Sequence, residues 1–243
     1  MWSIAKRELH FYFSQLSGYL VVGGYLLVTA LTLWFFNTPY NLLNTELGSF
    51  DPFFEFTPLL FLFLLPAISM RSFSEEFSLG TFELLLTKPL KPAQIFGGKL
   101  IGVGLILSIA LIPTILHAVA LESLFQDGSE LDWGKVMSSY FALILLACLF
   151  LVTSICASLL FQSQVASFLV ALLACFMHLY FWSFLADLTY NMTLFKFINN
   201  IGARVHYNNL SRGIIALGDL IYFLGFILTF FSLGVQLIKF KKS

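Results

Sequence analysis

The polar side chains whose spacing suggests a defined chemistry are concentrated in one segment, residues 71–92, between two apolar runs of membrane length. Ser72 and Glu75 have the spacing of a capping box, in which each side chain accepts a hydrogen bond from a backbone N–H group at a helix start. Gly80 is placed to end that helix in the left-handed conformation, and Thr81 can begin a second short helix. The sequence therefore predicts two short helices outside the membrane.

Aromatic side chains give the first of these helices a candidate binding face. Phe73 and Phe77 are four residues apart and share one side of a helix, while Glu75 and Glu76 point elsewhere. A helix that exposes aromatic rings is suited to lie in a groove of a partner protein. A solvated connector between two membrane helices is the simpler alternative, and the spacing alone leaves both interpretations open.

The chain lacks the motifs of the common catalytic and metal sites. It contains no H-E-x-x-H, no G-x-S-x-G and no Cys/His cluster at metal-binding spacing. Gly98 and Lys99 only partly match a nucleotide-binding loop, because Ala93 and Leu100 stand where that loop needs Gly and Ser or Thr. We therefore expect a non-enzymatic chain with no cofactor and no metal of its own. Any ATP must be bound by a different polypeptide.

The composition is that of an integral membrane protein. Of the 243 residues, 59% are hydrophobic and 11% are charged, whereas soluble domains carry roughly 25% charged residues. The formal net charge is zero, so the composition gives no indication of nucleic-acid binding. The three cysteines lie inside apolar runs and are typical of small core residues, not of a disulfide framework.

Six apolar runs approach the roughly 20 residues needed to cross the hydrocarbon core. We place them at 18–36, 54–70, 99–121, 136–161, 165–187 and 213–238. Residues 2–17 instead carry an apolar and a polar stripe at helical spacing, which predicts a helix in the membrane interface. A plain helical extension of the first span is the alternative. Gly98 and Gly102, four residues apart, could allow a second helix to approach closely.

The distribution of lysine and arginine predicts the orientation of the chain. If the N-terminus is inside, nine of these residues fall on cytoplasmic segments and four on outer segments. The nine are Lys6, Arg7, Arg71, Lys88, Lys91, Lys99, Lys239, Lys241 and Lys242, and the four are Lys135, Lys196, Arg204 and Arg212. This bias predicts that both termini are cytoplasmic.

The outer segment 188–212 is too polar to span the membrane, but its apolar residues could form a short helix on the outer leaflet. Just beyond it, Asp219 lies about two turns into the last apolar run, and ionisable residues inside spans are the default candidates for function. Arg212 and Arg204 are its candidate partners. We therefore consider Arg212 and Asp219 a candidate outer gate. The alternative is a structural hydrogen bond to a neighbouring helix.

Two segments resemble a known family of transport proteins. The first resembles the cytoplasmic coupling segment of ABC-2 type transporter permeases in Arg71, Phe73, Glu75, Glu76, Gly80, Thr81, Glu83, Leu85, Leu86 and Pro89. The second resembles an element of the permeases of the bacterial gliding-motility and nitrous-oxide reductase accessory transporters in His206, Arg212, Gly213, Asp219, Tyr222 and Phe223. Tyr207 and Ala216 depart from that element, which usually has Phe and an acid at these two positions.

The resemblance implies an all-α integral membrane fold in one permease domain, residues 1–243. That domain has an elbow helix at 1–17, a coupling segment at 71–92 and an outer re-entrant segment at 188–212. A cytoplasmic ABC ATPase, which binds the ATP, would dock on helix 72–79. The implied coupling residues are Arg71, Ser72, Phe73, Glu75, Glu76, Phe77, Gly80, Thr81 and Glu83. The other implied partners are membrane lipid and a second permease copy, or a different membrane subunit of the gliding system, in the bacterial inner membrane.

Substrate export in a gliding-motility system is the function that this resemblance favours. A structural anchor of a motility or secretion machine, without transport, is one alternative. The permease of a copper or nitrous-oxide accessory transporter is another. A membrane-embedded enzyme or passive channel belongs to a different class, and the missing catalytic motifs argue against the enzyme. The sequence leaves transporter and anchor both open and indicates no substrate.

Overall fold

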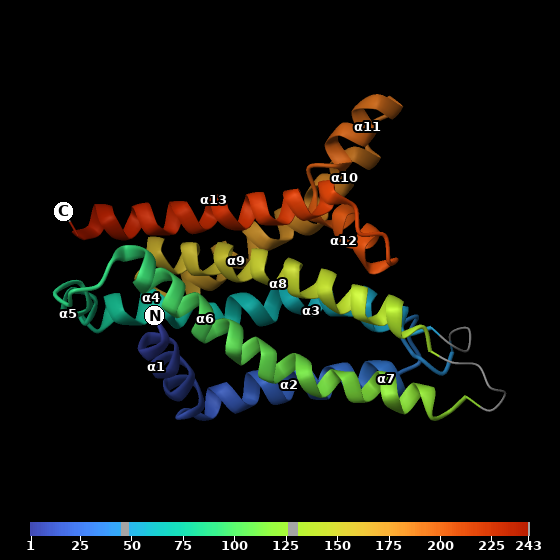
Figure 1. Cartoon of the computed structure of the whole chain (residues 1–243), viewed down its shortest axis with the longest axis horizontal. Coiled ribbons are helices and arrows are strands. Elements are labelled where there is room, and N and C mark those ends of the chain that lie inside the picture. The colour runs from blue at the N-terminus through green and yellow to red at the C-terminus, as the bar shows by residue number, and fades with distance from the viewer. Residues whose placement is uncertain (45–48, 126–130, 243) are drawn as a thin grey trace.

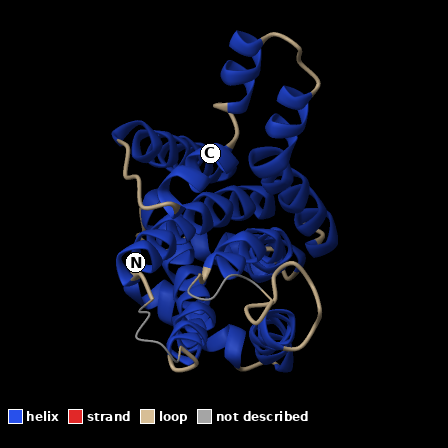
Figure 2. Cartoon of the chain, turned by 90° about the vertical axis from the view of Figure 1, so that its right-hand side faces the viewer, coloured by secondary structure: helices blue, strands red, loops and turns tan. Residues whose placement is uncertain are grey.

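The computed structural model describes residues 1–44, 49–125 and 131–242 (Figure 1). Within these ranges the regular elements are helices and none is a strand (Figure 2). In chain order they are α1 (Trp2–Phe13), α2 (Leu16–Trp34), α3 (Asp51–Ser69), α4 (Arg71–Ser78), α5 (Phe82–Leu86), α6 (Pro92–Leu111), η1 (Ile112–Thr114), α7 (Ile115–Glu122), α8 (Trp133–Leu160), α9 (Gln164–Phe176), η2 (Met177–Phe181), α10 (Trp182–Asp187), α11 (Met192–Asn199), α12 (Ala203–Ser211) and α13 (Leu217–Lys242).

Six of the described helical segments are long and apolar enough to cross a membrane. They are Leu16–Trp34, Asp51–Ser78, Pro92–Glu122, Trp133–Leu160, Gln164–Asp187 and Leu217–Lys242. The spans run along the long axis of the molecule (Figure 1). The predicted all-α, six-span membrane fold is therefore confirmed.

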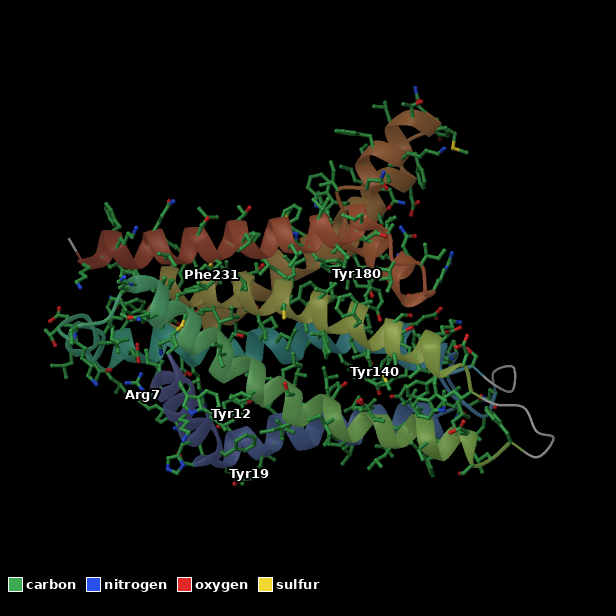
Figure 3. All side chains as sticks on the ribbon, in the orientation of Figure 1. Arg7, Tyr12, Tyr19, Tyr140, Tyr180 and Phe231 are labelled. Carbon is green, nitrogen blue, oxygen red and sulfur yellow. The ribbon has the colours of Figure 1, made fainter. Side chains whose placement is uncertain are left out.

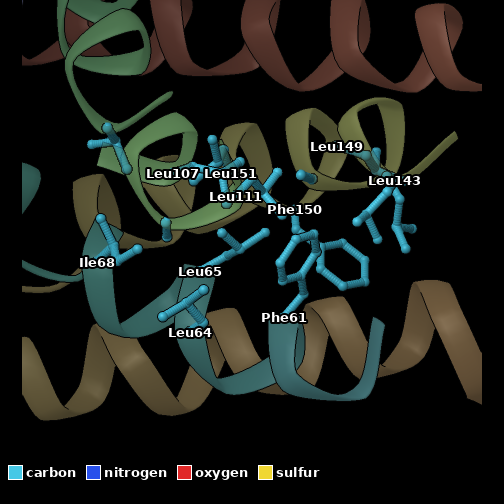
Figure 4. Packing of buried hydrophobic residues seen from close by; sticks show 14 of the residues in the cluster. Phe61, Leu64, Leu65, Ile68, Leu107, Leu111, Leu143, Leu149, Phe150 and Leu151 are labelled. Atoms are coloured by element: carbon cyan, nitrogen blue, oxygen red, sulfur yellow. The ribbon is translucent and has the colours of Figure 1, made fainter. Parts of the chain in front are cut away.

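The central helix of the bundle is α8, which contacts α3, α9, α12 and α13. Its side chains Leu143 and Phe150 join Phe61 and Leu65 of α3 in one buried cluster (Figure 4). By contrast, α2, α9 and α13 leave many large apolar side chains exposed. Exposed apolar faces on membrane-length helices are expected where lipid covers them.

A proline inside α3 explains how α12 is held. Pro58 has no N–H group, so the carbonyl of Phe54 lacks the hydrogen bond that a helix would normally give it. The hydroxyl of Tyr207 in α12 donates to that carbonyl at 2.7 Å. A side chain that lies 153 positions away in the chain thus satisfies the freed backbone group and joins α12 to α3.

Two glycines let α1 lie directly on α6, at an angle to the spans (Figure 1). A Cβ atom at Gly98 would be 2.9 Å from Ile4 Cβ, and one at Gly102 would be 2.8 Å from Glu8 Cβ. Side chains at these positions would therefore push the helices apart. The close helix contact predicted for Gly98 and Gly102 is confirmed, and the helix that they admit is α1.

The two ends of the bundle carry different elements. Both termini lie near α4 and α5 at one end, whereas α12 and the starts of α3 and α8 lie at the other (Figure 1). The labelled side chains follow this division, with Arg7 near the first end and Tyr180 toward the second (Figure 3). The candidate site described next belongs to the end with the termini.

Candidate functional site

The segment that carries the predicted capping box is a continuation of the second span. Met70 has helical backbone angles (φ −55°, ψ −31°), and its N–H group donates to the carbonyl of Pro66. The helix therefore enters α4 from α3 with its N–H groups already paired. Ser72 is buried inside the helix, and α4 has no side-chain cap. The predicted capping box of Ser72 and Glu75 is wrong, because no helix begins there.

The predicted end of this helix is confirmed. Gly80 has a φ of +66°, in the left-handed region. The N–H group of Gly80 donates to the carbonyl of Phe77, and that of Thr81 donates to the carbonyl of Glu76. These two bonds form a Schellman motif, which satisfies carbonyls at a helix end. The second short helix, α5, begins directly afterwards at Phe82.

The two aromatic residues of α4 pack inside the chain. Phe73 has no exposed surface and lies against Phe82 and Phe96. Phe77 packs on Phe82 with 4.6 Å between ring centroids, and the ammonium group of Lys241 lies 4.2 Å from the centroid of the Phe77 ring. The expectation that both rings are exposed for a partner is therefore wrong. Since α4 continues α3, its aromatic face turns toward α5 and α6.

A cluster of charges around one buried lysine joins α4 to α1 and α6. Lys99 of α6 has a side chain that is 1% exposed. Its ammonium group lies 2.8 Å from Glu8 Oε1 and 3.1 Å from Glu76 Oε1, and it also donates to the carbonyl of Ser72. Arg7 contacts the same Glu76 oxygen at 2.5 Å. We call Arg7, Glu8, Glu76 and Lys99 the Lys99 cluster.

Arg71 makes a second connection, to the junction between α1 and α2. Its guanidinium group donates to Gln15 Oε1 at 2.5 Å and to Ser17 Oγ at 3.0 Å. Tyr12 lies close by, and burial raises the pKa of its phenol to about 12 while Arg71 acts in the opposite direction. The phenol is therefore neutral near pH 7. The start of α4 is thus joined to the junction between α1 and α2.

Between these contacts lies a cavity of about 250 Å³. The Lys99 cluster lines it together with Arg71, Glu75, Leu79 and Thr81. Glu75 Oε2 is buried and has no hydrogen-bond partner among the described residues. This carboxylate therefore belongs to the lining of a cavity that residues of α1 also line.

One exposed part of the segment runs from the turn after α4 into α5. Leu79 is 67% exposed and Leu84 is 65% exposed, and Gly80, Thr81 and Glu83 are exposed between them. We call Leu79, Gly80, Thr81, Glu83 and Leu84 the exposed tip. Sequence reasoning missed both leucines, although Leu79 directly precedes the glycine that ends α4.

At the other end of the bundle, Asp219 pairs with a histidine. Asp219 is the third residue of α13, so the prediction that it lies two turns into the span is wrong. Its Oδ1 atom lies 2.5 Å from His206 Nδ1, and the His206 ring stacks on Tyr222 at 4.0 Å between centroids. The predicted pairing with Arg212 or Arg204 is wrong, since Arg204 instead lies over the ring of Tyr180 at 5.3 Å.

The other nitrogen of His206 also faces an oxygen atom. His206 Nε2 lies 2.9 Å from the carbonyl oxygen of Asn200. Both ring nitrogens thus lie within hydrogen-bond distance of an oxygen atom. His206 thereby joins α12 both to Asp219 of α13 and to Asn200 in the connection between α11 and α12.

The described residues contain no group of three or more His, Cys, Asp or Glu side chains that could hold a metal ion. Ion pairs, hydrogen bonds and apolar contacts join the helices at the end of the bundle with the termini.

Comparison with known proteins gives one family. The family model described as ABC-2 family transporter protein matches residues 41–242, which include α3 to α13. No curated protein matches the chain. The matched range contains both the exposed tip and the pair of His206 and Asp219.

Proposed function

Because the chain belongs to the ABC-2 family of transporter proteins, the membrane permease subunits of ABC exporters, we propose that the exposed tip is where a cytoplasmic ATPase acts on it. ATP hydrolysis then takes place in the partner chain. The permease contributes no catalytic group and no cofactor site of its own.

The observation that carries this proposal is the exposure of Leu79 and Leu84 on the two sides of the turn at Gly80. The Schellman motif at Gly80 holds the turn in one conformation, so a partner meets a preformed surface. Two leucines about two-thirds exposed offer apolar area of the kind that protein contacts bury.

The connections behind the tip suggest how its movement reaches the membrane. Since α4 continues α3 with only Met70 between them, a displacement of the tip moves the second span directly. The Lys99 cluster joins the same helix to α1 and α6. In this mechanism, ATP-driven closure of the ATPase pulls on three helices together and opens an outward path.

We assign Arg71, Ser72, Phe73, Glu75, Glu76 and Phe77 to transmission of this movement, not to the contact itself. Arg71 binds the junction between α1 and α2, and Glu76 binds α1. Phe73 and Phe77 fill the space between α4, α5 and α6. Gly80, Thr81 and Glu83 belong to the contact surface, together with the two leucines.

We further propose that the transporter serves bacterial gliding motility. The resemblance of His206, Arg212, Asp219 and Tyr222 to the gliding-motility element supports this subtype. The excess of lysine and arginine on the segments near the tip supports an inner-membrane orientation with both termini cytoplasmic. A second permease copy or a different membrane subunit of the gliding system completes the membrane unit, and membrane lipid surrounds it.

A site-specific photocrosslinker tests the contact and the orientation together. In intact cells that express the ATPase, a benzophenone amino acid at Leu84 should crosslink to the ATPase chain. The same probe at Leu43, an exposed leucine in the loop between α2 and α3, should not. Crosslinking from Leu43 but not from Leu84 would reverse the orientation, and crosslinking from neither position would remove the tip as the contact.

A further inference from the structure

Two adjoining polar cavities lie at the end of the bundle opposite the exposed tip. The larger has a volume of about 400 Å³ and the smaller about 190 Å³. They share Glu55, Tyr207 and Asn208. The larger cavity is also lined by Asp51, Lys135 and Arg212, and the smaller by Tyr40, Tyr180 and Arg204.

Most of the polar groups around these cavities are engaged by neighbours. Lys135 contacts Asp51 Oδ2 at 2.6 Å. Arg204 lies over the ring of Tyr180, and the Tyr207 hydroxyl is used by the carbonyl of Phe54. These contacts join α3, α8, α12 and η2, so they form walls with fixed positions.

Two charges remain without such a neighbour. The side chains of Glu55 and Arg212 are exposed and line the larger cavity, and neither makes a hydrogen bond or ion pair with a described residue. They have opposite charges and yet do not pair with each other. A carboxylate and a guanidinium group that face one polar cavity at separate points are complementary to a molecule that carries both charges.

We propose that this cavity binds a zwitterionic group, with its ammonium nitrogen against Glu55 and its phosphate or carboxylate against Arg212. Guanidinium groups bind phosphate and carboxylate oxygens in a bidentate geometry. The ring of Tyr40, beside Glu55 in the smaller cavity, offers a face that attracts an ammonium group. A volume of about 400 Å³ is within the usual range of small-molecule sites, about 300–1,000 Å³.

This chemistry occurs both in free zwitterions and in the headgroups of zwitterionic lipids. The binding site lies far from the exposed tip and needs no ATPase for its formation. The result of a test on the permease alone therefore does not depend on whether the proposed coupling function is correct.

The test uses the full chain, purified without the ATPase and placed in nanodiscs of phosphatidylglycerol. Calorimetric titration with phosphoethanolamine should give saturable binding at one site. Phosphate alone and ethanolamine alone should each bind at least tenfold more weakly.

Glu55→Gln and Arg212→Gln should each weaken phosphoethanolamine binding at least tenfold, because each removes one of the two charges. Lys196→Gln, which changes an exposed cation of α11 outside both cavities, is the matched control and should bind like the wild type.

A second arm distinguishes the two sources of the zwitterion. Native mass spectrometry counts the phosphatidylethanolamine molecules that remain bound after incubation with this lipid. A retained lipid that is lost in both variants identifies the headgroup as the ligand, whereas phosphoethanolamine binding without lipid retention identifies a free zwitterion. The proposal is overturned if neither molecule binds, or if binding is the same in Glu55→Gln, Arg212→Gln and the wild type. Thermal unfolding of each variant checks that the fold is intact.

Discussion

The ammonium group of Lys99 lies 3.1 Å from Glu76 Oε1, and the two residues belong to different membrane spans. Glu76 is on the helix that continues the second span, and Lys99 is on the third. Because the Lys99 side chain is 1% exposed, solvent does not screen this contact as it would a surface ion pair. The segment behind the exposed tip is therefore bound to the bundle by ion pairs with a buried lysine, which needs a carboxylate partner to balance its charge.

Removal of the Glu8 and Glu76 carboxylates should show how far the stability of the fold depends on balancing the Lys99 charge. Glu8→Gln combined with Glu76→Gln leaves the Lys99 charge buried without an anionic partner. Breaking a buried pair in this way typically costs about 3–5 kcal/mol in unfolding free energy. Addition of Lys99→Met to this double variant should recover most of the loss, since the unpaired charge is then gone. Unfolding in detergent measures the double and the triple variant, with Glu83→Gln as an exposed control. A double variant as stable as the wild type would mean that the Lys99 cluster contributes little to the unfolding free energy.

The hydrogen bond between Tyr207 and the carbonyl of Phe54 predicts that the cost of losing the Tyr207 hydroxyl depends on Pro58. Tyr207→Phe should lower the unfolding free energy by about 1–3 kcal/mol, because it leaves a buried carbonyl without a donor. In a Pro58→Ala background the restored N–H group can bond to that carbonyl, so Tyr207→Phe should cost clearly less. Tyr19→Phe, at an exposed position of α2, is the control. Equal costs of Tyr207→Phe in the two backgrounds would contradict this explanation of Pro58.

The pair of His206 and Asp219 predicts a defect that is separate from ATPase binding. We expect Asp219→Ala to impair export or motility while the ATPase still assembles with the permease, because the pair lies far from the exposed tip. His206→Ala should give the same defect, and the double variant should be no worse than either single change. The measurement is transport or gliding together with co-purification of the ATPase. If Arg212→Ala but not His206→Ala reproduces the Asp219→Ala defect, Arg212 is the functional partner after all.

The six spans could be predicted because each needs only a local run of apolar residues, and the end of α4 follows from one further residue. Gly80 was predicted to end α4 because the left-handed conformation is intrinsic to glycine. The same property explains one error of boundary. The last apolar run was placed from residue 213, but Gly213 has a φ of +84°, and α13 begins only at Leu217.

The errors in the site concern contacts between residues far apart in the chain. Whether Phe73 faces a partner or the bundle depends on the direction in which α4 leaves α3, and Met70 sets this direction by continuing the helix. Lys99 pairs with Glu8, 91 positions away, as well as with Glu76. The partner of Asp219 is a histidine on another helix. Periodicity identifies the faces of a helix but does not identify the element that each face meets.

The central claim is that the exposed tip, and not the aromatic face of α4, holds the ATPase. The most direct measurement is the amount of ATPase that co-purifies with the permease from detergent, normalised to the amount of permease in the membrane. Leu79→Ala with Leu84→Ala should leave permease abundance and unfolding unchanged, because both side chains are exposed. Each leucine can contribute about 1.5–3 kcal/mol when a partner covers it, so the double variant should weaken the contact by about 100-fold or more. Phe73→Ala should instead destabilise the permease itself, since it leaves a cavity in the core. If the Leu79 and Leu84 double variant retains the ATPase at the wild-type level, the tip is not the contact and the account is contradicted.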